Sequence, residues 1–209
     1  MIYAAAYRPE GGKGDRIREH ILGRKLLEQG LLREYGRTWE IRIPENGKPC
    51  LKGEPGIFFN ISHTEGMAVC AVCDRPVGID IQIRKPCSKG LIRRMCSPEE
   101  YSLICKMEKA EAEKALIRLW TLKESFVKAD GRGLLVPFRQ LSFAHRLERE
   151  PGRICPEEDE FVLPLDLGSR HEFTEDMPGR HFFEAQLGEH YHIGVCIMDQ
   201  ALDKKGAAL

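Results

Sequence analysis

A short apolar strand that carries a carboxylate constrains this chain most. Residues 77–83 read Val-Gly-Ile-Asp-Ile-Gln-Ile. Side chains alternate between the two faces of a strand, so Asp80 and Gln82 project together, away from the isoleucines. Burying a carboxylate in so apolar a setting costs free energy unless the group gains a partner. A metal ion would supply that partner. The alternative is an Asp that ends a strand and bonds to backbone amides.

A helix further along the chain carries a second set of charged residues. Trp120, Glu124 and Lys128 are spaced four residues apart and therefore share one helix face. An apolar stripe that includes Leu122 and Phe126 lies alongside, so we expect the helix to pack with its polar residues bordering the core. The alternative is a surface Glu–Lys pair that contributes only about 0.3–0.5 kcal/mol.

Together the two segments suggest a chemistry. They supply two carboxylates, Asp80 and Glu124, and two ammonium groups, Lys123 and Lys128. A divalent cation bound to a polyphosphate needs carboxylate oxygens on the metal and cationic groups on the phosphates. The combination therefore predicts Mg²⁺-dependent chemistry on a pyrophosphate. The sequence has no Walker A loop, no Gly-x-Gly-x-x-Gly before a helix and no Gly-x-Ser-x-Gly elbow, which disfavours other nucleotide and acyl-transfer sites.

The rest of the chain shows strand and helix patterns in succession. Asp15 is expected to cap a helix that Gly30 ends. Residues 97–100, Ser-Pro-Glu-Glu, start another helix, and a longer one is expected from about 108 to 129, ended by Gly131. Strands are expected at residues 39–43, 57–61, 67–72, 77–83, 140–144, 161–165, 181–187 and 192–198.

This order predicts an α+β fold made of two similar halves, residues 1–84 and 85–209. The runs 66–72 and 192–198 look alike, which favours equivalent strands of a duplicated unit. A cleft between two such halves is a common place for a ligand. We therefore expect a pseudo-twofold arrangement with the active site in the cleft.

Composition describes an ordinary soluble globular protein, with 42% hydrophobic and 31% charged residues. There is no apolar run of transmembrane length and no signal-peptide pattern at the start, so a cytoplasmic protein is expected. Residues 84–139 hold 13 basic against 7 acidic residues, whereas residues 140–209 hold 7 against 14. The basic middle segment would steer an acidic ligand or an acidic partner protein. Neither a nucleic acid nor a membrane is expected as a partner.

The eight cysteines favour reduced thiols, because several lie inside apolar runs where free Cys behaves as a small hydrophobe. Cys70 and Cys73 have the spacing of half a zinc site, but no second pair follows at zinc-ribbon spacing. A zinc-stabilised interaction protein is the minor alternative.

Several short motifs follow one another in a particular order over residues 15–140. They are Gly47-Lys48-Pro49, Phe59-Asn60-Ile61-Ser62-His63, Gly78-Ile79-Asp80-Ile81, Trp120-Thr121-Leu122-Lys123-Glu124-Ser125-Phe126-Val127-Lys128 and Gly131-Arg132-Gly133-Leu134. This order resembles the 4'-phosphopantetheinyl transferases of the surfactin-synthetase-activating type. The resemblance implies a pseudo-twofold α+β fold with coenzyme A between the halves. It also implies transfer of the phosphopantetheine arm to a serine of an acyl or peptidyl carrier protein, with release of 3',5'-ADP.

The resemblance implies roles for individual residues at the reacting phosphates. Asp80 and Glu124 would ligate Mg²⁺, and Gln82 would be a weak third ligand or be replaced by water. Lys128 would contact the α- or β-phosphate and stabilise the leaving 3',5'-ADP.

Other residues would bind coenzyme A or act on the carrier. Ser62, His63 and Lys123 would contact phosphate oxygens, and Lys48 would contact the nucleotide end. Glu100 matches the position proposed as general base for the carrier serine, whose hydroxyl is a poor nucleophile by itself.

The chain departs from the family pattern in two places. It has Asp-x-Gln where many members have Asp-x-Glu, and it lacks a basic segment near the start that would grip the 3'-phosphate. Lys13 and Arg16 are the expected substitutes, with weaker discrimination between coenzyme A and its 3'-dephospho form. Gln82 also leaves open a non-catalytic coenzyme A- or carrier-binding module, although the retained carboxylates argue against it.

The implied carrier protein would be acidic and helical. Residues 91–95, Leu-Ile-Arg-Arg-Met, place apolar side chains beside two arginines and are the expected docking surface. An ordinary amphipathic helix is the equally weighted alternative. Because the fold would already be a pseudo-dimer, a monomer is expected.

Overall fold

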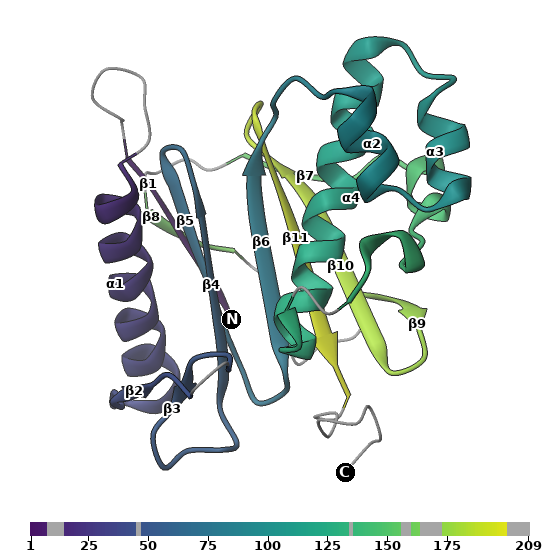
Figure 1. The fold of residues 1–209 in the computed structure, drawn as a ribbon. Coiled ribbons are helices and arrows are strands. Elements are labelled where there is room, and N and C mark those ends of the chain that lie inside the picture. The colour runs from purple at the N-terminus through teal and green to yellow at the C-terminus, as the bar shows by residue number, and fades with distance from the viewer. Residues whose placement is uncertain (8–14, 45–46, 134–135, 156–159, 164–172, 200–209) are drawn as a thin grey trace.

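Two large β-sheets, each covered by one long helix, and one small two-stranded sheet build the molecule in the computed structural model (Figure 1). The structure describes residues 1–7, 15–44, 47–133, 136–155, 160–163 and 173–199. The α-helices are α1 (Arg16–Tyr35), α2 (Lys89–Met95), α3 (Pro98–Ile104) and α4 (Lys109–Asp130), with 3₁₀ turns η3 (Phe138–Gln140) and η4 (Ala144–Glu148). The strands are β1 (Ile2–Ala6), β2 (Ile41–Arg42), β3 (Cys50–Leu51), β4 (Phe58–Thr64), β5 (Met67–Cys73), β6 (Val77–Ile83), β7 (Gly152–Ile154), β8 (Glu160–Leu163), β9 (Thr174–Met177), β10 (Arg180–Leu187) and β11 (Tyr191–Met198).

Each sheet combines strands from the early and the late part of the sequence. The first has the order β4-β5-β1-β8, and the second has the order β6-β11-β10-β7, with β9 also paired to β10. Thus β8, which comes late in the sequence, pairs with β1, whereas β6, which comes early, pairs with β11. The mixture of helix and sheet confirms the α+β expectation.

Three apolar clusters form the core. One lies between the sheets and takes residues from both, among them Ile2, Val69, Ile79 and Val195. A second lies between α1 and the first sheet, and a third lies between α4 and the second sheet. Each sheet is therefore buried on both faces, which explains the nearly continuous apolar runs of β5 and β11.

Two glycines let α4 lie directly against the second sheet. A Cβ at Gly78 would come within 2.0 Å of the Ser125 carbonyl oxygen, and one at Gly194 within 2.7 Å of the Thr121 carbonyl. No side chain can occupy either position without separating helix and sheet. The close approach brings the last two turns of α4 against the strand that carries Asp80.

The facing edge strands of the two sheets, β4 and β6, are connected by side chains. The Asn60 Oδ1 accepts the backbone N–H of Ile79 at 2.9 Å, and the Ser62 Oγ accepts that of Ile81 at 3.3 Å. We call this line of contact the seam. Polar side chains here satisfy strand-edge donors that would otherwise be buried without a partner.

Several element predictions are confirmed. Strand β6 has the predicted bounds, and α4 differs by one residue at each end from the predicted helix. Ser97 caps α3 in a capping box with Glu100, and Pro98 is the first helical residue. Asp15 caps α1 by accepting the backbone N–H groups of Ile17 and Arg18.

Three element predictions are wrong. Helix α1 continues through Gly30 to Gly36, because Gly30 is needed for contact: a Cβ there would lie 2.8 Å from the Tyr3 ring. Residues 140–144 are not a strand but join two 3₁₀ turns, with Phe143 fully buried. The strand at 39–43 shrinks to two residues.

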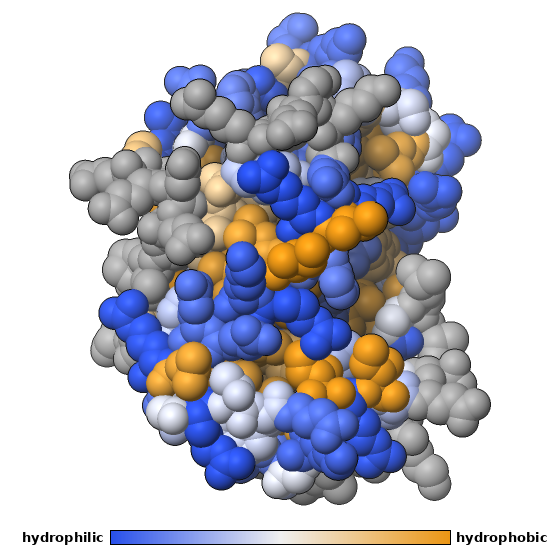
Figure 2. All heavy atoms as spheres, turned by 90° about the vertical axis from the view of Figure 1, so that its left-hand side faces the viewer, coloured by the Kyte–Doolittle hydropathy of each residue, from blue (hydrophilic) through white to orange (hydrophobic). Residues whose placement is uncertain are grey.

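The face that α1 presents is mixed (Figure 2). Large apolar side chains exposed in the described part of the chain are Ile17, Ile21, Leu32, Tyr35 and Ile43. Among the described residues, no helix combines the length and apolar character that crossing a bilayer requires.

Candidate functional site

Asp80 receives three hydrogen bonds at the seam. Its Oδ1 accepts from the Ser62 hydroxyl at 2.8 Å and from the Lys128 ammonium at 2.5 Å, and its Oδ2 accepts from the Gln82 amide at 3.2 Å. Asp80 is almost fully buried, at 2% exposure. The hydrogen-bond donors that a buried carboxylate requires thus come from three elements: β4, β6 and α4.

Lys128 contacts strands of both sheets at this point. Its Nζ donates to the Ile79 carbonyl and to the Ser62 hydroxyl, both at 3.0 Å, in addition to Asp80. The ammonium lies in the last turn of α4, where the helix dipole favours a cation. A quarter of its side chain is exposed, so it also faces the solvent above the seam.

Glu124 lies one turn before Lys128 and has a different environment. No hydrogen bond or ion pair joins its carboxylate to another residue that the structure describes. Burial raises the pKa of Glu124, and the nearby Asp80 raises it further, whereas Lys128 opposes both effects. The two carboxylates therefore repel each other, and a cation between them would relieve that repulsion.

These residues surround an open pocket of about 300 Å³ at the seam. It is lined by Ile61, Ser62, His63, Asp80, Gln82, Trp120, Glu124 and Lys128. The structure thereby brings together six of the residues predicted from sequence: Ser62, His63, Asp80, Gln82, Glu124 and Lys128. We call Ser62, Asp80, Gln82, Glu124 and Lys128 the seam cluster.

The donors of the seam cluster fit magnesium only in part. Within the described ranges, no three His, Cys, Asp or Glu side chains are grouped as a closed metal site. Mg²⁺ is commonly held by one or two carboxylates together with waters and substrate phosphates, and Asp80 and Glu124 match that pattern. Gln82 turns its amide NH₂ toward Asp80, so its oxygen would reach a shared metal only after the amide rotates.

Comparison with known proteins identifies the family of this chain. The sequence model of the 4'-phosphopantetheinyl transferase superfamily matches residues 76–196, a segment that contains Asp80, Glu124 and Lys128. The chain belongs to this superfamily.

Individual relatives include two from Bacillus subtilis. The chain is 38% identical over 133 residues to 4'-phosphopantetheinyl transferase Sfp, covering 62% of this chain and 58% of the relative. It is 40% identical over 147 residues to 4'-phosphopantetheinyl transferase ffp, covering 69% and 64%. The mouse L-aminoadipate-semialdehyde dehydrogenase-phosphopantetheinyl transferase is 27% identical over 195 residues, covering 85% and 60%. The match thus spans roughly three fifths of each relative's length.

Two residues expected at the transferase site lie elsewhere. Glu100 and Lys123 are both fully buried and form an ion pair with the Lys123 Nζ 2.5 Å from the Glu100 Oε2. Lys123 also donates to the Met95 and Phe138 carbonyls, and Glu100 accepts from the Phe143 N–H. The roles predicted for them, general base and phosphate contact, do not agree with this burial. The pair instead ties α2, α3 and η3 to α4.

The other predicted phosphate and nucleotide contacts have separate locations. Lys48 donates to the Val77 carbonyl beside β6 and lines a second, largely apolar pocket of about 510 Å³. Burial lowers the pKa of Lys48 to about 8, and Lys128 acts in the same direction. Arg16 is exposed at the start of α1, and Lys13 lies outside the described residues.

Sequence reasoning missed Glu19, which supports His63 from behind the pocket. The Glu19 Oε2 lies 3.0 Å from the His63 Nδ1, and the Glu19 Oε1 accepts the Tyr7 hydroxyl at 2.9 Å. Glu19 is only 4% exposed although its neighbours on both sides are exposed. An acidic residue in the first helical turn is ordinary, so no local sequence signal marks the inward role of Glu19.

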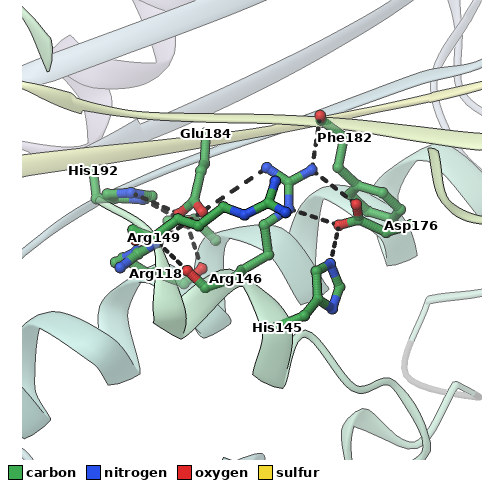
Figure 3. A network of polar contacts seen from close by, with 9 residues as sticks. Arg118, His145, Arg146, Arg149, Asp176, Phe182, Glu184 and His192 are labelled. Atoms are coloured by element: carbon green, nitrogen blue, oxygen red, sulfur yellow. Dashed lines mark hydrogen bonds and ion pairs between the residues drawn. The ribbon is translucent and has the colours of Figure 1, made fainter. Parts of the chain in front are cut away.

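A second group of charges was also missed and surrounds Arg118, near the middle of α4 (Figure 3). Arg118 makes two hydrogen bonds to the Glu184 carboxylate, at 2.9 and 3.0 Å, and donates to the Arg146 and Arg149 carbonyls. His192 approaches the same carboxylate at 3.2 Å. We call these contacts the Arg118–Glu184 network.

The network continues to the edge of the second sheet. Arg146 binds Asp176 through two hydrogen bonds, at 2.8 and 3.0 Å, and donates to the Phe182 carbonyl. Burial alone would raise the pKa of Glu184, but the nearby His192 ring and the hydrogen bonds from Arg118 outweigh it and lower the pKa to about 2. These contacts fix η4 and β9 against α4, so we assign the network to the scaffold of the fold.

The zinc alternative is wrong for a simple geometric reason. Cys70 and Cys73 lie three residues apart in one strand, and their side chains therefore point to opposite faces. Cys70 packs in the cluster under α1, whereas Cys73 packs in the cluster between the sheets. The two sulfurs cannot bind one ion from opposite faces of a sheet.

Proposed function

We propose that this chain transfers the 4'-phosphopantetheine group of coenzyme A to a serine of an acyl or peptidyl carrier protein. The observation that carries the proposal is the meeting of Asp80, Glu124 and Lys128 in one open pocket at the seam. Membership of the 4'-phosphopantetheinyl transferase superfamily supports the same conclusion.

In the proposed reaction, the serine oxygen bonds to the phosphorus that carries the pantetheine arm. The anhydride bond from that phosphorus to the bridging oxygen breaks, and the bridging oxygen leaves with 3',5'-ADP. The serine proton must leave as the new bond forms. Because Glu100 is buried against Lys123, we assign this proton to water in the open pocket and not to Glu100.

The seam residues would divide the work of binding the pyrophosphate. Lys128 would exchange its contact with Asp80 for one with a phosphate oxygen and offset the negative charge that develops on 3',5'-ADP. Ser62 and His63, which line the same pocket, would donate to phosphate oxygens. Lys48, in the second, largely apolar pocket, would contact the nucleotide end.

Magnesium fits this assignment as an ion that accompanies the substrate. Asp80 and Glu124 would hold it, with the remaining positions left to phosphate oxygens and water. When bound, the metal would offset charge on the pyrophosphate as the anhydride breaks. Burial and then Asp80 raise the pKa of Glu124, and a bound divalent cation would offset the repulsion between the two carboxylates.

The carrier protein would dock on α2. Arg93 and Arg94 are exposed there, whereas Ile92 and Met95 are buried and hold the helix in place. The Lys123 ammonium further anchors α2 through the Met95 carbonyl. A fixed helix with two exposed arginines fits an acidic helical partner, because complementary charge speeds and orients association.

We also infer a pseudo-twofold relation between the halves. Helix α1 covers β5 in the first sheet as α4 covers β11 in the second, and both strands pair with neighbours on each side. The seam pocket would then be the cleft between the halves. A single chain built this way would not need a second copy to complete the site.

The test is the intact mass of an apo carrier protein after incubation with this protein, coenzyme A and Mg²⁺. We expect a gain of one phosphopantetheine group, lost in a parallel sample with EDTA. The double variant Arg93→Glu/Arg94→Glu should raise KM for the carrier while leaving KM for coenzyme A unchanged. Coenzyme A binding without any mass gain on several unrelated carriers would instead favour the non-catalytic binding module.

A further inference from the structure

Glu19 and His63 form a pair that reaches from α1 into the seam pocket. His63 lines the pocket, and a third of its side chain is exposed, whereas the Glu19 carboxylate behind it is nearly inaccessible. A buried carboxylate is costly unless its oxygens are satisfied. Here both are, one by the His63 ring and the other by the Tyr7 hydroxyl.

The contact determines which ring nitrogen of His63 carries a proton. An ionised carboxylate only accepts hydrogen bonds, so the His63 Nδ1, at 3.0 Å from the Glu19 Oε2, must be the donor. The other nitrogen, Nε2, is then the one left to face the pocket. Paired carboxylates are a common means of setting the tautomer and the ring orientation of a functional histidine.

Tyr7 holds Glu19 in turn. Its hydroxyl donates to Glu19 and accepts the backbone N–H of Asp15 at 2.8 Å, which links strand β1 to the start of α1. Glu19 is therefore fixed at both oxygens, and its position depends on how α1 begins.

We propose that Glu19 is a positioning residue that holds the Nδ1–H of His63 and thereby turns an Nε2–H toward a phosphate oxygen of the bound substrate. The proposal rests on the proposed function, because the phosphate in question is that of coenzyme A. The negative charge of Glu19 also balances a ring that carries protons on both nitrogens, the form in which Nε2 donates to an anion.

The first test reads the tautomer directly and needs no activity. The ring ¹⁵N chemical shifts of histidine-labelled protein are measured at pH 8.5, and His63→Asn identifies the His63 signals. We expect the Nδ1-protonated form in the unmodified protein and a mixture of both tautomers in Glu19→Gln, because an amide can either donate or accept. Tyr7→Phe keeps the carboxylate and should retain the Nδ1-protonated form.

The second test measures binding by calorimetric titration with coenzyme A. Glu19→Gln should weaken binding about tenfold, as expected for loss of a charge-assisted hydrogen bond. The matched control is Glu28→Gln, which makes the same chemical change at an exposed position of the same helix. Circular dichroism of each variant verifies that it is folded.

The outcomes distinguish the role of Glu19 from the proposed transferase function. An Nε2-protonated His63 in the unmodified protein, or an unchanged tautomer in folded Glu19→Gln, would overturn the role of Glu19 even in an active transferase. Equal coenzyme A affinity in Glu19→Gln and Glu28→Gln would overturn it as well. Failure of the unmodified protein to bind coenzyme A would refute the proposed function, while the tautomer result would still decide whether Glu19 sets the ring.

Discussion

Two carboxylates beside helix α4, those of Glu124 and Glu184, differ in whether the fold supplies them with hydrogen-bond partners. Near the end of this helix, Glu124 has no partner among the described residues and borders an open pocket. Nearer the middle of α4, Arg118 donates two hydrogen bonds to the buried Glu184 carboxylate. The pKa of Glu124 is raised and that of Glu184 is lowered to about 2. A carboxylate that the fold has already satisfied stabilises the structure, whereas one left unsatisfied remains available to a ligand.

The largest effect should come from removing the available carboxylate. We expect Glu124→Gln to reduce phosphopantetheine transfer at least about 100-fold, because a preorganised charge at the reacting phosphates is lost. The rate of carrier modification by mass spectrometry measures this. Glu111→Gln, an exposed change on the same helix, should leave the rate unaltered. A fully active Glu124→Gln enzyme would contradict our assignment of the metal ligands.

Removing the satisfied carboxylate should act on stability instead. Glu184→Gln leaves the buried Arg118 without its counter-charge, so we expect the free energy of unfolding to fall by about 3–5 kcal/mol. Urea denaturation provides the measurement. Glu124→Gln should change stability far less, since it relieves repulsion with Asp80. Equal losses of stability in both variants would contradict the distinction between a hydrogen-bonded carboxylate and one without a partner.

The pH dependence of stability should have opposite signs for the two carboxylates. Because the pKa of Glu184 drops from an ordinary 4.5 to about 2, its contribution is complete above pH 4.5 and is lost as pH falls toward 2. The pKa of Glu124 is raised from 4.5, so stability should decline as pH rises through the range just above 4.5. Unfolding free energies measured across these ranges should flatten below pH 4.5 in Glu184→Gln and above it in Glu124→Gln. A wild-type slope in either variant would refute the corresponding assignment.

The smallest effect is expected at Gln82. Its amide donates to Asp80 and is partly exposed, so Gln82→Ala should alter transfer only a few-fold. Gln82→Glu would add a third carboxylate and should lower the Mg²⁺ concentration required for half-maximal rate. Rate measurements against Mg²⁺ concentration test both. A loss in Gln82→Ala as large as in Glu124→Gln would make Gln82 an essential ligand.

Local sequence patterns predicted those features of the site that depend only on residues close together in the sequence. The alternation in 77–83 placed Asp80 and Gln82 on one face of β6, and helical spacing placed Glu124 above Lys128. The meeting of these segments at the seam depends on Gly78 and Gly194, whose role appears only when α4 lies on the sheet. The family resemblance linked the two segments before their contact was known.

Long-range contacts explain what the sequence left unpredicted. Glu184 and Arg118 are 66 residues apart, and nothing in either neighbourhood indicates the other. Glu100 and Lys123 occupy motif positions, yet their mutual contact removes both from solvent. Gly30 looks like a helix end in sequence and is a packing contact with Tyr3 in the structure. In each case the decisive partner comes from a distant segment.

The exchange of strands between the sheets has a consequence for how the protein is made. On the ribosome, β1 (residues 2–6) emerges well before its neighbour β8, which follows only at residues 160–163. Likewise β6 must wait for β11, at residues 191–198. A nascent chain would therefore expose unpaired strand edges until β8 and β11 have been made, the condition under which chaperone binding is most useful. Cutting the chain between β6 and α2 should yield two insoluble fragments that regain structure only when they are refolded together.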